Sequence, residues 1–282
     1  MAADDVVWRL IACALSDLAA KGAEPVGVML NYPLRAGTTP ASTPAHAGAQ
    51  VQAVSGEAQH AFPSASATGP RRSPGWSAPN DWDATFLDGL AQVLTHYAAP
   101  LIGGDTVSIP PHAPRVLTLT AVGRATHRPV PVRSGVQPGD HLYVTGTIGA
   151  ALLGFERPET EPNAYRRPIA RIADGIALAP HASAMMDVSD GLLLDAQRMA
   201  AASNLAVEIA LDAVPVPPAF EQDRLRAVTW GDDYQLLFTL PSGVLPPVPA
   251  TRIGHFAAGA GLTLTDHGTP VPLPDRLGYS HG

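Results

Sequence analysis

The stretch DVSDGLLLD, residues 187–195, places two carboxylates three residues apart, at Asp187 and Asp190, where an apolar segment turns into a helix. The segment 182–191 is expected to form a strand, and residues 190–202 a helix. Two carboxylates held close together repel each other unless a cation lies between them. In α/β folds ligands collect at strand ends, and a helix N-terminus attracts phosphate. The stretch therefore predicts a site that holds a cation together with a phosphate group.

The composition narrows the classes of function. The chain has 282 residues, 46% of them hydrophobic, enough for one large domain or two ordinary ones. No apolar run approaches the roughly 18 residues of a membrane span, and no secretory signal pattern opens the chain. The net charge of −7 argues against a nucleic-acid partner, because a phosphate backbone is bound by a basic surface. A single cysteine, Cys13, excludes an internal disulfide and favours a reducing, cytoplasmic setting.

The basic residues are almost all arginines. Lys21 is the only lysine, and it does not stand in the G-x-x-x-x-G-K-[ST] context of a P-loop. If the chain binds ATP, metal ions and arginines must therefore neutralise the phosphate charge.

The first part of the chain, residues 1–130, is predicted to form an α+β domain. A stretch at about 35–79 is rich in Ala, Ser, Thr, Pro and Gly, and we expect a disordered insertion there because it has little apolar surface to bury. The expected elements are helices at 6–21, capped by Gly22, and at 81–97, after the N-cap Asn80, and strands at 25–34, 99–106 (ending in a Gly-Gly-Asp turn) and 115–125.

The second part, residues 131–282, is predicted to form a second α+β domain. It begins with a connector at 131–140 that is rich in turn residues. Besides the strand and helix of the opening stretch, the expected elements are strands at 141–146, 205–214, 232–240, 251–256 and 261–265, a short helix directly after the first of these, and a helix at 169–178.

Four aspartates stand where an apolar segment meets a turn or a helix, namely Asp17, Asp105, Asp187 and Asp190. Ordinary structural roles are open to them: Asp17 could face solvent, Asp105 could be a turn residue, and Ser189 or Asp190 could cap a helix. Magnesium, however, prefers carboxylate oxygens and bridges substrate phosphates. Several aspartates at loop ends beside glycine-rich turns are typical of a metal-dependent phosphoryl-transfer site.

Six motifs occur along the chain in this order: LSDLAAKGAEP (15–25), LIGGDT (101–106), RSGVQPGDHLYVTGTIGAALLG (133–154), MDVSDGLLLDAQRMAAAS (186–203), GDDYQLLF (231–238) and LGY (277–279). Together they resemble the thiamine-monophosphate kinase family, within the aminoimidazole ribonucleotide synthetase-like superfamily. The resemblance covers nearly the whole chain outside the insertion. It implies a two-domain α+β fold, with an N-terminal sheet domain that pairs in a homodimer and a C-terminal α/β domain.

The resemblance also implies an activity, the ATP- and Mg²⁺-dependent phosphorylation of thiamine monophosphate to thiamine diphosphate. By position in the motifs, the implied magnesium ligands are Asp17, Asp105, Asp187 and Asp190. The implied ATP contacts are Gly104, Asp105, Arg133 and Ser189. The implied contacts to thiamine monophosphate are Asp232, which replaces the glutamate of a G-E-D-Y motif, and Tyr279. Both keep a structural reading, in which Asp232 caps a strand and Tyr279 covers the edge of the core.

The chain departs from the family pattern at its start. Family members begin with a further segment that carries magnesium ligands and a substrate-contacting histidine, so we expect part of the metal site to be missing. Two other functions therefore stay open. One is a truncated nucleotide-binding pseudoenzyme of the same fold without turnover. The other is a relative of the hydrogenase-maturation or selenophosphate enzymes, which would use a cysteine; Cys13 lies in an expected helix, which disfavours this reading.

Overall fold

The computed structural model describes residues 1–35, 82–160 and 162–280. Apart from Arg35, the insertion predicted at about 35–79 lies outside the described residues, as does Asn80. The helices are α1 Ala3–Ala19, α2 Trp82–His96, α3 Ala150–Glu156, α4 Pro162–Arg166, α5 Ile172–Leu178, α6 Leu192–Ser203 and α7 Arg224–Val228, with 3₁₀ turns η1 Leu211–Ala213 and η2 Pro218–Phe220. The strands are β1 Ala23–Arg35, β2 Leu101–Ile109, β3 Thr118–Ala125, β4 His141–Val144, β5 Ala184–Asp187, β6 Leu205–Ala210, β7 Leu236–Leu240, β8 Thr251–Ala258, β9 Gly261–Asp266 and β10 Thr269–Val271.

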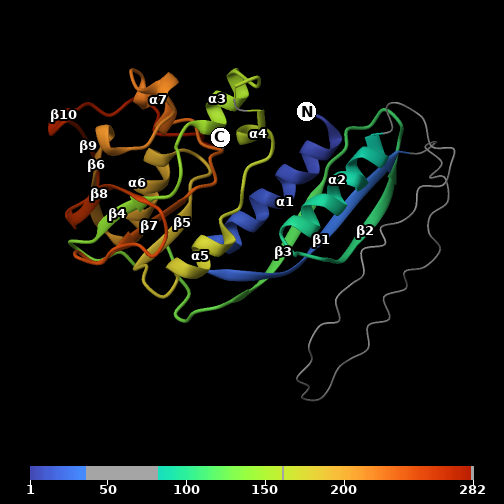
Figure 1. The fold of residues 1–282 in the computed structure, drawn as a ribbon, viewed down its shortest axis with the longest axis horizontal. Coiled ribbons are helices and arrows are strands. Elements are labelled where there is room, and N and C mark those ends of the chain that lie inside the picture. The colour runs from blue at the N-terminus through green and yellow to red at the C-terminus, as the bar shows by residue number, and fades with distance from the viewer. Residues whose placement is uncertain (36–81, 161, 281–282) are drawn as a thin grey trace, which may run out of the picture.

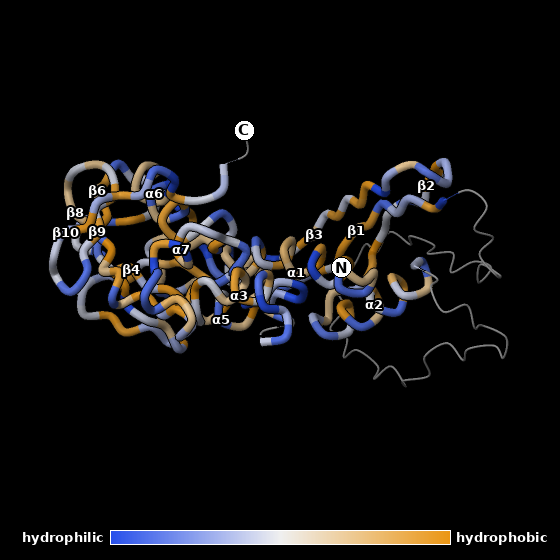
Figure 2. Tube along the Cα trace, turned by 90° about the horizontal axis from the view of Figure 1, so that it is seen from above, coloured by the Kyte–Doolittle hydropathy of each residue, from blue (hydrophilic) through white to orange (hydrophobic). Residues whose placement is uncertain are grey.

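The first part of the chain forms a three-stranded sheet covered on one face by helices. Its order is β2-β1-β3, with β2 parallel and β3 antiparallel to β1. Both α1 and α2 lie on the same side of this sheet (Figure 2). Ile11 and Leu15 of α1 and Phe86 of α2 are fully buried in a cluster with Val28 of β1. Burial of these side chains on one stripe of each helix fixes α1 against the sheet.

Helix α1 begins at Ala3, three residues earlier than predicted. Asp4 and Asp5 lie in its first turn, where negative charge interacts favourably with the helix dipole. Both also pair with Arg167, at 2.6 and 2.7 Å, and these contacts come from far along the chain. The expected C-terminal cap was wrong, because α1 ends at Ala19 with Ala20 as its cap, and Gly22, with a φ of +58°, lies in the turn that leads into β1.

Strand β2 is longer than predicted and contains the Gly-Gly-Asp sequence that was expected to form a turn. It runs to Ile109, with Gly104 opposite Leu30 and Asp105 opposite Asn31 in β1. Gly104 has a φ of +141°, and a Cβ atom there would lie 2.0 Å from the Leu30 carbonyl oxygen. The glycine therefore allows close approach to β1 rather than a reversal of the chain, and the predicted turn was wrong.

The second part of the chain forms a seven-stranded sheet with the order β10-β9-β6-β8-β4-β7-β5. Most neighbours are antiparallel, while β6 and β9 run parallel. Leu192 and Met199 of α6 are fully buried in the same cluster as Ile209 and Phe256 of the sheet. This packing holds the start of α6 close to the end of β5.

Five expected strands are shorter than the sequence suggests. Those predicted at 115–125, 141–146 and 182–191 are observed at 118–125, 141–144 and 184–187. The strand predicted at 232–240 begins only at Leu236, because Asp232 and Tyr234 have φ angles of +61° and +50° and cannot be extended. The strand predicted at 205–214 ends at Ala210, where η1 follows. Helices α4 and α7 and strand β10 were not predicted.

Helix α1 connects the two halves of the molecule. Figure 1 shows it crossing from the three-stranded sheet toward α5 and the larger sheet, and it contacts both α5 and β5. Asp17, the predicted site residue on α1, therefore lies where the halves meet. Among the helices of the described residues, none is long and apolar enough to cross a bilayer.

Candidate functional site at the junction of the two sheets

Asp187 ends β5, and its side chain is buried beside α1. Burial raises the pKa of Asp187 to about 6; the negative charge of Asp17 adds to the rise, and the Ser16 hydroxyl opposes it. Ser16 Oγ is itself buried and makes no hydrogen bond of regular geometry with any described residue. The structure thus brings Asp17 and Asp187 together, and a cation would relieve their repulsion.

Two basic residues accompany this carboxylate pair. Lys21 follows α1, and its Nζ lies 3.4 Å from the carbonyl oxygen of Pro131 in the connector. Burial and the charge of Arg133 lower the pKa of Lys21, while the charges of Asp187 and Asp17 raise it. Two carboxylates and two cations therefore act on one another where α1, the connector and β5 meet. Such mixed charge suits a ligand that carries both a metal ion and phosphate groups.

The loop after β5 is wrapped around Asp195 of α6. The amides of Ser189 and Asp190 each donate to Asp195 Oδ2 at 3.1 Å. Arg198 Nη1 lies 3.0 Å from the other oxygen of Asp195 and 2.5 Å from Asp190 Oδ2. Asp195 is fully buried, and this burial raises its pKa. Because both amides are hydrogen-bonded to Asp195, these two backbone donors are not available to a phosphate group.

The start of α6 is covered by the C-terminal motif LGY. The helix begins at Leu192, two residues later than predicted, and the Leu194 amide donates to the carbonyl of Leu277 at 3.1 Å. The Tyr279 amide donates to the carbonyl of Asp190 at 2.8 Å. Tyr279 thus lies beside the carboxylate loop, and its side chain is 61% exposed, which argues against a role as a cover of the core.

The segment GDDY, residues 231–234, packs against the same loop. The Asp232 amide donates to the carbonyl of Ser189 at 2.9 Å, and the Asp232 carboxylate pairs with Arg9 of α1 at 2.6 Å. Asp233 points the other way, and its carboxylate accepts the amides of Gly149 and Ala151 at the start of α3. Burial raises the pKa of Asp233 to about 7. Asp232 therefore does not cap a strand, because its carboxylate forms an ion pair with Arg9 of α1.

Asp105 lies apart from this cluster. It is exposed on β2, and Gly104 lies beside it in the same strand. Among the residues that the structure describes, no group of three or more Asp, Glu, His or Cys side chains is arranged to hold a metal ion. The Asp17–Asp187 pair nevertheless fits magnesium, which is commonly held by one or two carboxylates together with substrate phosphates.

Cys13 does not have the environment of a reactive cysteine. It is half-buried in α1, and burial raises its pKa to about 11. A thiol with such a pKa is almost entirely protonated at neutral pH and is a poor nucleophile.

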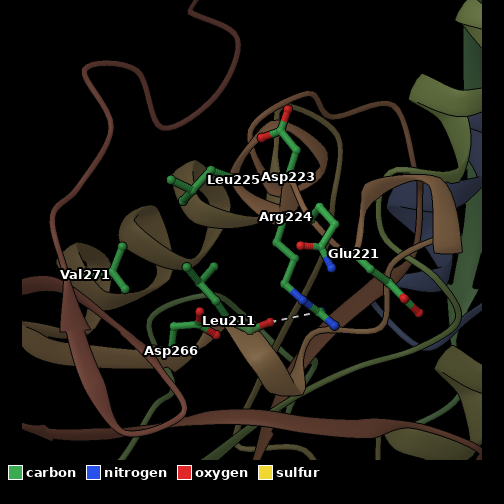
Figure 3. A pocket seen from close by; sticks show the side chains of 8 residues that line it. Leu211, Glu221, Asp223, Arg224, Leu225, Asp266 and Val271 are labelled. Carbon is green, nitrogen blue, oxygen red and sulfur yellow. Dashed lines mark hydrogen bonds between the residues drawn. The ribbon is translucent and has the colours of Figure 1, made fainter.

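A separate hollow of about 200 Å³ lies away from the cluster, between η1, α7 and the strands β9 and β10 (Figure 3). Arg224 in its wall donates to the carbonyls of Leu211 and Val214, at 3.1 and 2.6 Å. None of the predicted site residues lines it. The hollow therefore has no part in the site built here.

Three residues of the junction were not predicted as functional: Arg9, Lys21 and Asp195. Lys21 lies inside the motif LSDLAAKGAEP and was considered only as a P-loop lysine. Asp195 closes the quoted stretch DVSDGLLLD, and its distance of five residues from Asp190 was the available signal. Arg9 carries no local signal, because its partner lies more than 200 residues later in the chain.

Comparison with known proteins assigns both halves to one family. The family model "AIR synthase related protein, N-terminal domain" matches residues 1–61 and 53–125, and the corresponding C-terminal model matches 137–252. The thiamine-monophosphate kinase of Caulobacter vibrioides is 30% identical over 310 residues, which cover 100% of this chain and 75% of the relative.

Solved structures show the same fold. The crystal structure of thiamine-monophosphate kinase from Stenotrophomonas maltophilia K279a matches with a TM-score of 0.70 and 28% identity, over 96% of this chain and 81% of that chain. The structure of AaThiL complexed with AMPPCP and TMP matches with a TM-score of 0.70 and 22% identity, over 99% of this chain and 82% of that chain. The predicted two-domain α+β fold is confirmed. The chain therefore belongs to the thiamine-monophosphate kinase family of AIR synthase-related proteins.

Proposed function

We propose that this chain transfers the terminal phosphate of ATP directly to thiamine monophosphate, which gives ADP and thiamine diphosphate. The observation that carries the proposal is the convergence of the family's motifs at one junction, where Asp17, Lys21, Arg133 and Asp187 act on one another beside the loop of Asp190. The kinases of the family and the AaThiL complex with AMPPCP and TMP support this assignment of substrates.

The residues divide between donor and acceptor. On the ATP side we assign Arg133 and Ser189, together with Gly104 and Asp105 of β2. Arginine suits the phosphate oxygens because its guanidinium group donates in a bidentate fashion. On the thiamine side we assign Asp232 and Tyr279, which are hydrogen-bonded through their backbones to the Ser189–Asp190 loop. In-line transfer requires donor and acceptor to be held close together, and this shared loop supports such positioning.

Magnesium is proposed as the metal, as several ions, with Asp17, Asp105, Asp187 and Asp190 as ligands shared among them. When bound, it would neutralise phosphate charge and help to orient the transferred group. Asp190 would have to exchange its contact with Arg198, which is 2.5 Å long, for a contact with the ion. Within the part of the chain that the structure describes, neither Asp17 nor Asp187 forms an ion pair that the metal would have to replace, so we assign them as the primary ligands.

We further propose the domain boundary at residues 130/131 and a homodimer formed through the N-terminal sheet. The open face and edge of that sheet expose Met29, Ile102, Val107 and Val122. A cluster of exposed apolar side chains on a sheet is typical of a protein–protein contact. The absence of a nucleic-acid partner and the cytoplasmic location stay predictions.

Nucleotide binding without turnover is the second candidate function. It is favoured by the absence, among residues 1–35, 82–160 and 162–280, of a group of three or more side chains suited to hold a metal. In that case ATP would stabilise the protein against unfolding, and no product would form.

One experiment separates the two functions. ADP and thiamine diphosphate are measured independently with ATP, Mg²⁺ and thiamine monophosphate, with thiamine as the control acceptor. The kinase proposal predicts equimolar products with thiamine monophosphate, and a loss of at least about 100-fold in Asp187→Asn. Asp223→Asn, in the separate hollow, is the matched control and should retain activity within about twofold. A folded protein that gains stability with ATP but forms no thiamine diphosphate would support the second function.

A further inference from the structure

Arg9 lies between α1 and the GDDY segment, and its side chain is only 19% exposed. Its Nη2 lies 2.6 Å from Asp232 Oδ1, and its Nη1 donates to the carbonyl of Tyr165 at 2.5 Å. The guanidinium carbon stands 4.4 Å from the ring centroid of Tyr165 and 5.8 Å from that of Tyr234. Arg9 is therefore held by a carboxylate, a carbonyl and two aromatic rings, which fixes its orientation.

The backbone that carries Asp232 is constrained as well. Asp232 and Tyr234 both adopt positive φ angles, of +61° and +50°, which are unfavourable for residues with a side chain. Their amides donate to the carbonyls of Ser189 and Val188, both at 2.9 Å. Such a conformation persists only when surrounding contacts hold it. The Tyr234 hydroxyl adds one contact, 3.3 Å from Asp232 Oδ1.

We propose that Arg9 is a positioning residue that fixes the carboxylate of Asp232 and thereby sets the affinity for the phosphate acceptor, without affecting the affinity for ATP. This inference rests on the proposed function, in which Asp232 contacts thiamine monophosphate. Arg9 contacts Asp232, Tyr165 and Tyr234. Among the described residues, none of the proposed ATP contacts (Gly104, Asp105, Arg133 and Ser189) shares a hydrogen bond or an ion pair with it.

The test compares Arg9→Gln, Arg9→Lys, Asp232→Asn and the double variant Arg9→Gln/Asp232→Asn. Arg9→Gln should raise the KM for thiamine monophosphate by about tenfold and change the KM for ATP by less than about twofold. Arg9→Lys should recover part of the loss, because the ammonium group keeps the charge but not the fork geometry. The double variant should be no worse than the poorer single variant, because both changes remove the same contact.

The matched control is Arg226→Gln. Arg226 of α7 pairs with Glu156 of α3, outside the N-terminal sheet and the residues assigned to either substrate, and its side chain is 51% exposed. Its loss should leave both KM values unchanged. Equal increases of both KM values in Arg9→Gln would overturn the proposal. So would a wild-type acceptor KM in Asp232→Asn together with a raised one in Arg9→Gln, which would place Arg9 itself on the acceptor.

A second measurement separates this inference from the proposed function. The free energies of unfolding of the wild type, Arg9→Gln, Asp232→Asn and the double variant form a thermodynamic cycle that needs no substrate. If the wild-type chain forms no thiamine diphosphate, the proposed function fails, and the cycle still decides whether Arg9 and Asp232 are coupled. A coupling of about tenfold in the unfolding equilibrium constant is expected, and additive effects of the two substitutions would refute the positioning role.

Discussion

Replacement of Asp187 by asparagine should stabilise the metal-free protein while it destroys the activity. Burial raises the pKa of Asp187 from 3.8 to about 6, so at neutral pH the folded protein must ionise a carboxyl group in an unfavourable place. A rise of about two pH units corresponds to about 3 kcal/mol at about 1.4 kcal/mol per unit. The asparagine amide must still find an acceptor in a buried site, so we expect a net gain of about 1–2 kcal/mol.

The stability difference between Asp187→Asn and the wild type should depend on pH in a definite direction. Because the folded-state pKa is raised, the stabilisation that Asp187 contributes is complete below its unfolded pKa of 3.8 and is lost as pH rises through about 6. The advantage of Asp187→Asn should therefore be largest above pH 7 and nearly vanish at pH 5, where the ionisation penalty has fallen by about half and the cost of the buried amide offsets the rest. Thermal unfolding in the presence of a chelator measures it, with an expected rise of the midpoint by about 3–6 °C at pH 7.5.

Asp105→Asn is the matched control, since it makes the same chemical change at an exposed carboxylate of β2. Its midpoint should stay within about 1 °C of the wild type. Addition of ATP and Mg²⁺ should raise the midpoint of the wild type and leave that of Asp187→Asn nearly unchanged. A metal-free Asp187→Asn protein that is less stable than the wild type at pH 7.5 would refute the reasoning, because it would mean that local contacts stabilise the ionised form.

Three further predictions concern charged groups around the junction. Asp195→Ala removes the buried acceptor of two amides and a partner of Arg198, and should lower the free energy of unfolding by about 3 kcal/mol in urea titrations; a change below 1 kcal/mol would contradict it. Lys21→Met removes a cation from beside Asp17 and Asp187 and should lower the Mg²⁺ concentration needed for ATP-dependent stabilisation, measured by thermal shift. A higher requirement would instead mean that Lys21 serves the phosphates. Burial raises the pKa of Asp233 to about 7, so its stabilisation is lost as pH rises through 7; Asp233→Asn should flatten the unfolding midpoint between pH 5 and 8, and an unchanged slope would count against it.

The local sequence pattern predicted those helices and strands whose structure depends mainly on their own residues. Helix α6 and strand β5 follow from the apolar periodicity of MDVSDGLLLDAQRMAAAS, and the turn after α1 follows from Gly22, which tolerates a left-handed conformation. The errors arose where a distant partner decides the local structure. β2 continues through Gly104 because β1 lies against it, and β7 starts late because Asp232 and Tyr234 are held in a left-handed conformation by contacts to the loop after β5.

The candidate site was likewise only partly predictable: the sequence indicated the positions of its carboxylates but not their contacts. Spacing placed Asp187 and Asp190 at the end of a buried strand, which is correct for Asp187, whereas Asp190 lies in the loop after β5. It gave no indication that Asp190 pairs with Arg198 or that the loop amides turn inward to Asp195, because hydrogen bonds of that kind depend on how the loop closes. Ion pairs between residues far apart, such as Arg9 with Asp232, need the tertiary fold.

The polar positions of α1 explain why one helix serves both parts of the proposed reaction. Arg9, Cys13, Ser16 and Asp17 follow one another at spacings of four, three and one, so they share one face of the helix. That face meets β5 at Asp187 and the GDDY segment at Asp232, while the apolar face is buried on the N-terminal sheet. A substitution on this face acts on one contact, but a displacement of α1 changes both carboxylate contacts at once. The packing of α1 against its sheet therefore sets the relative positions of the metal-binding and acceptor-binding residues.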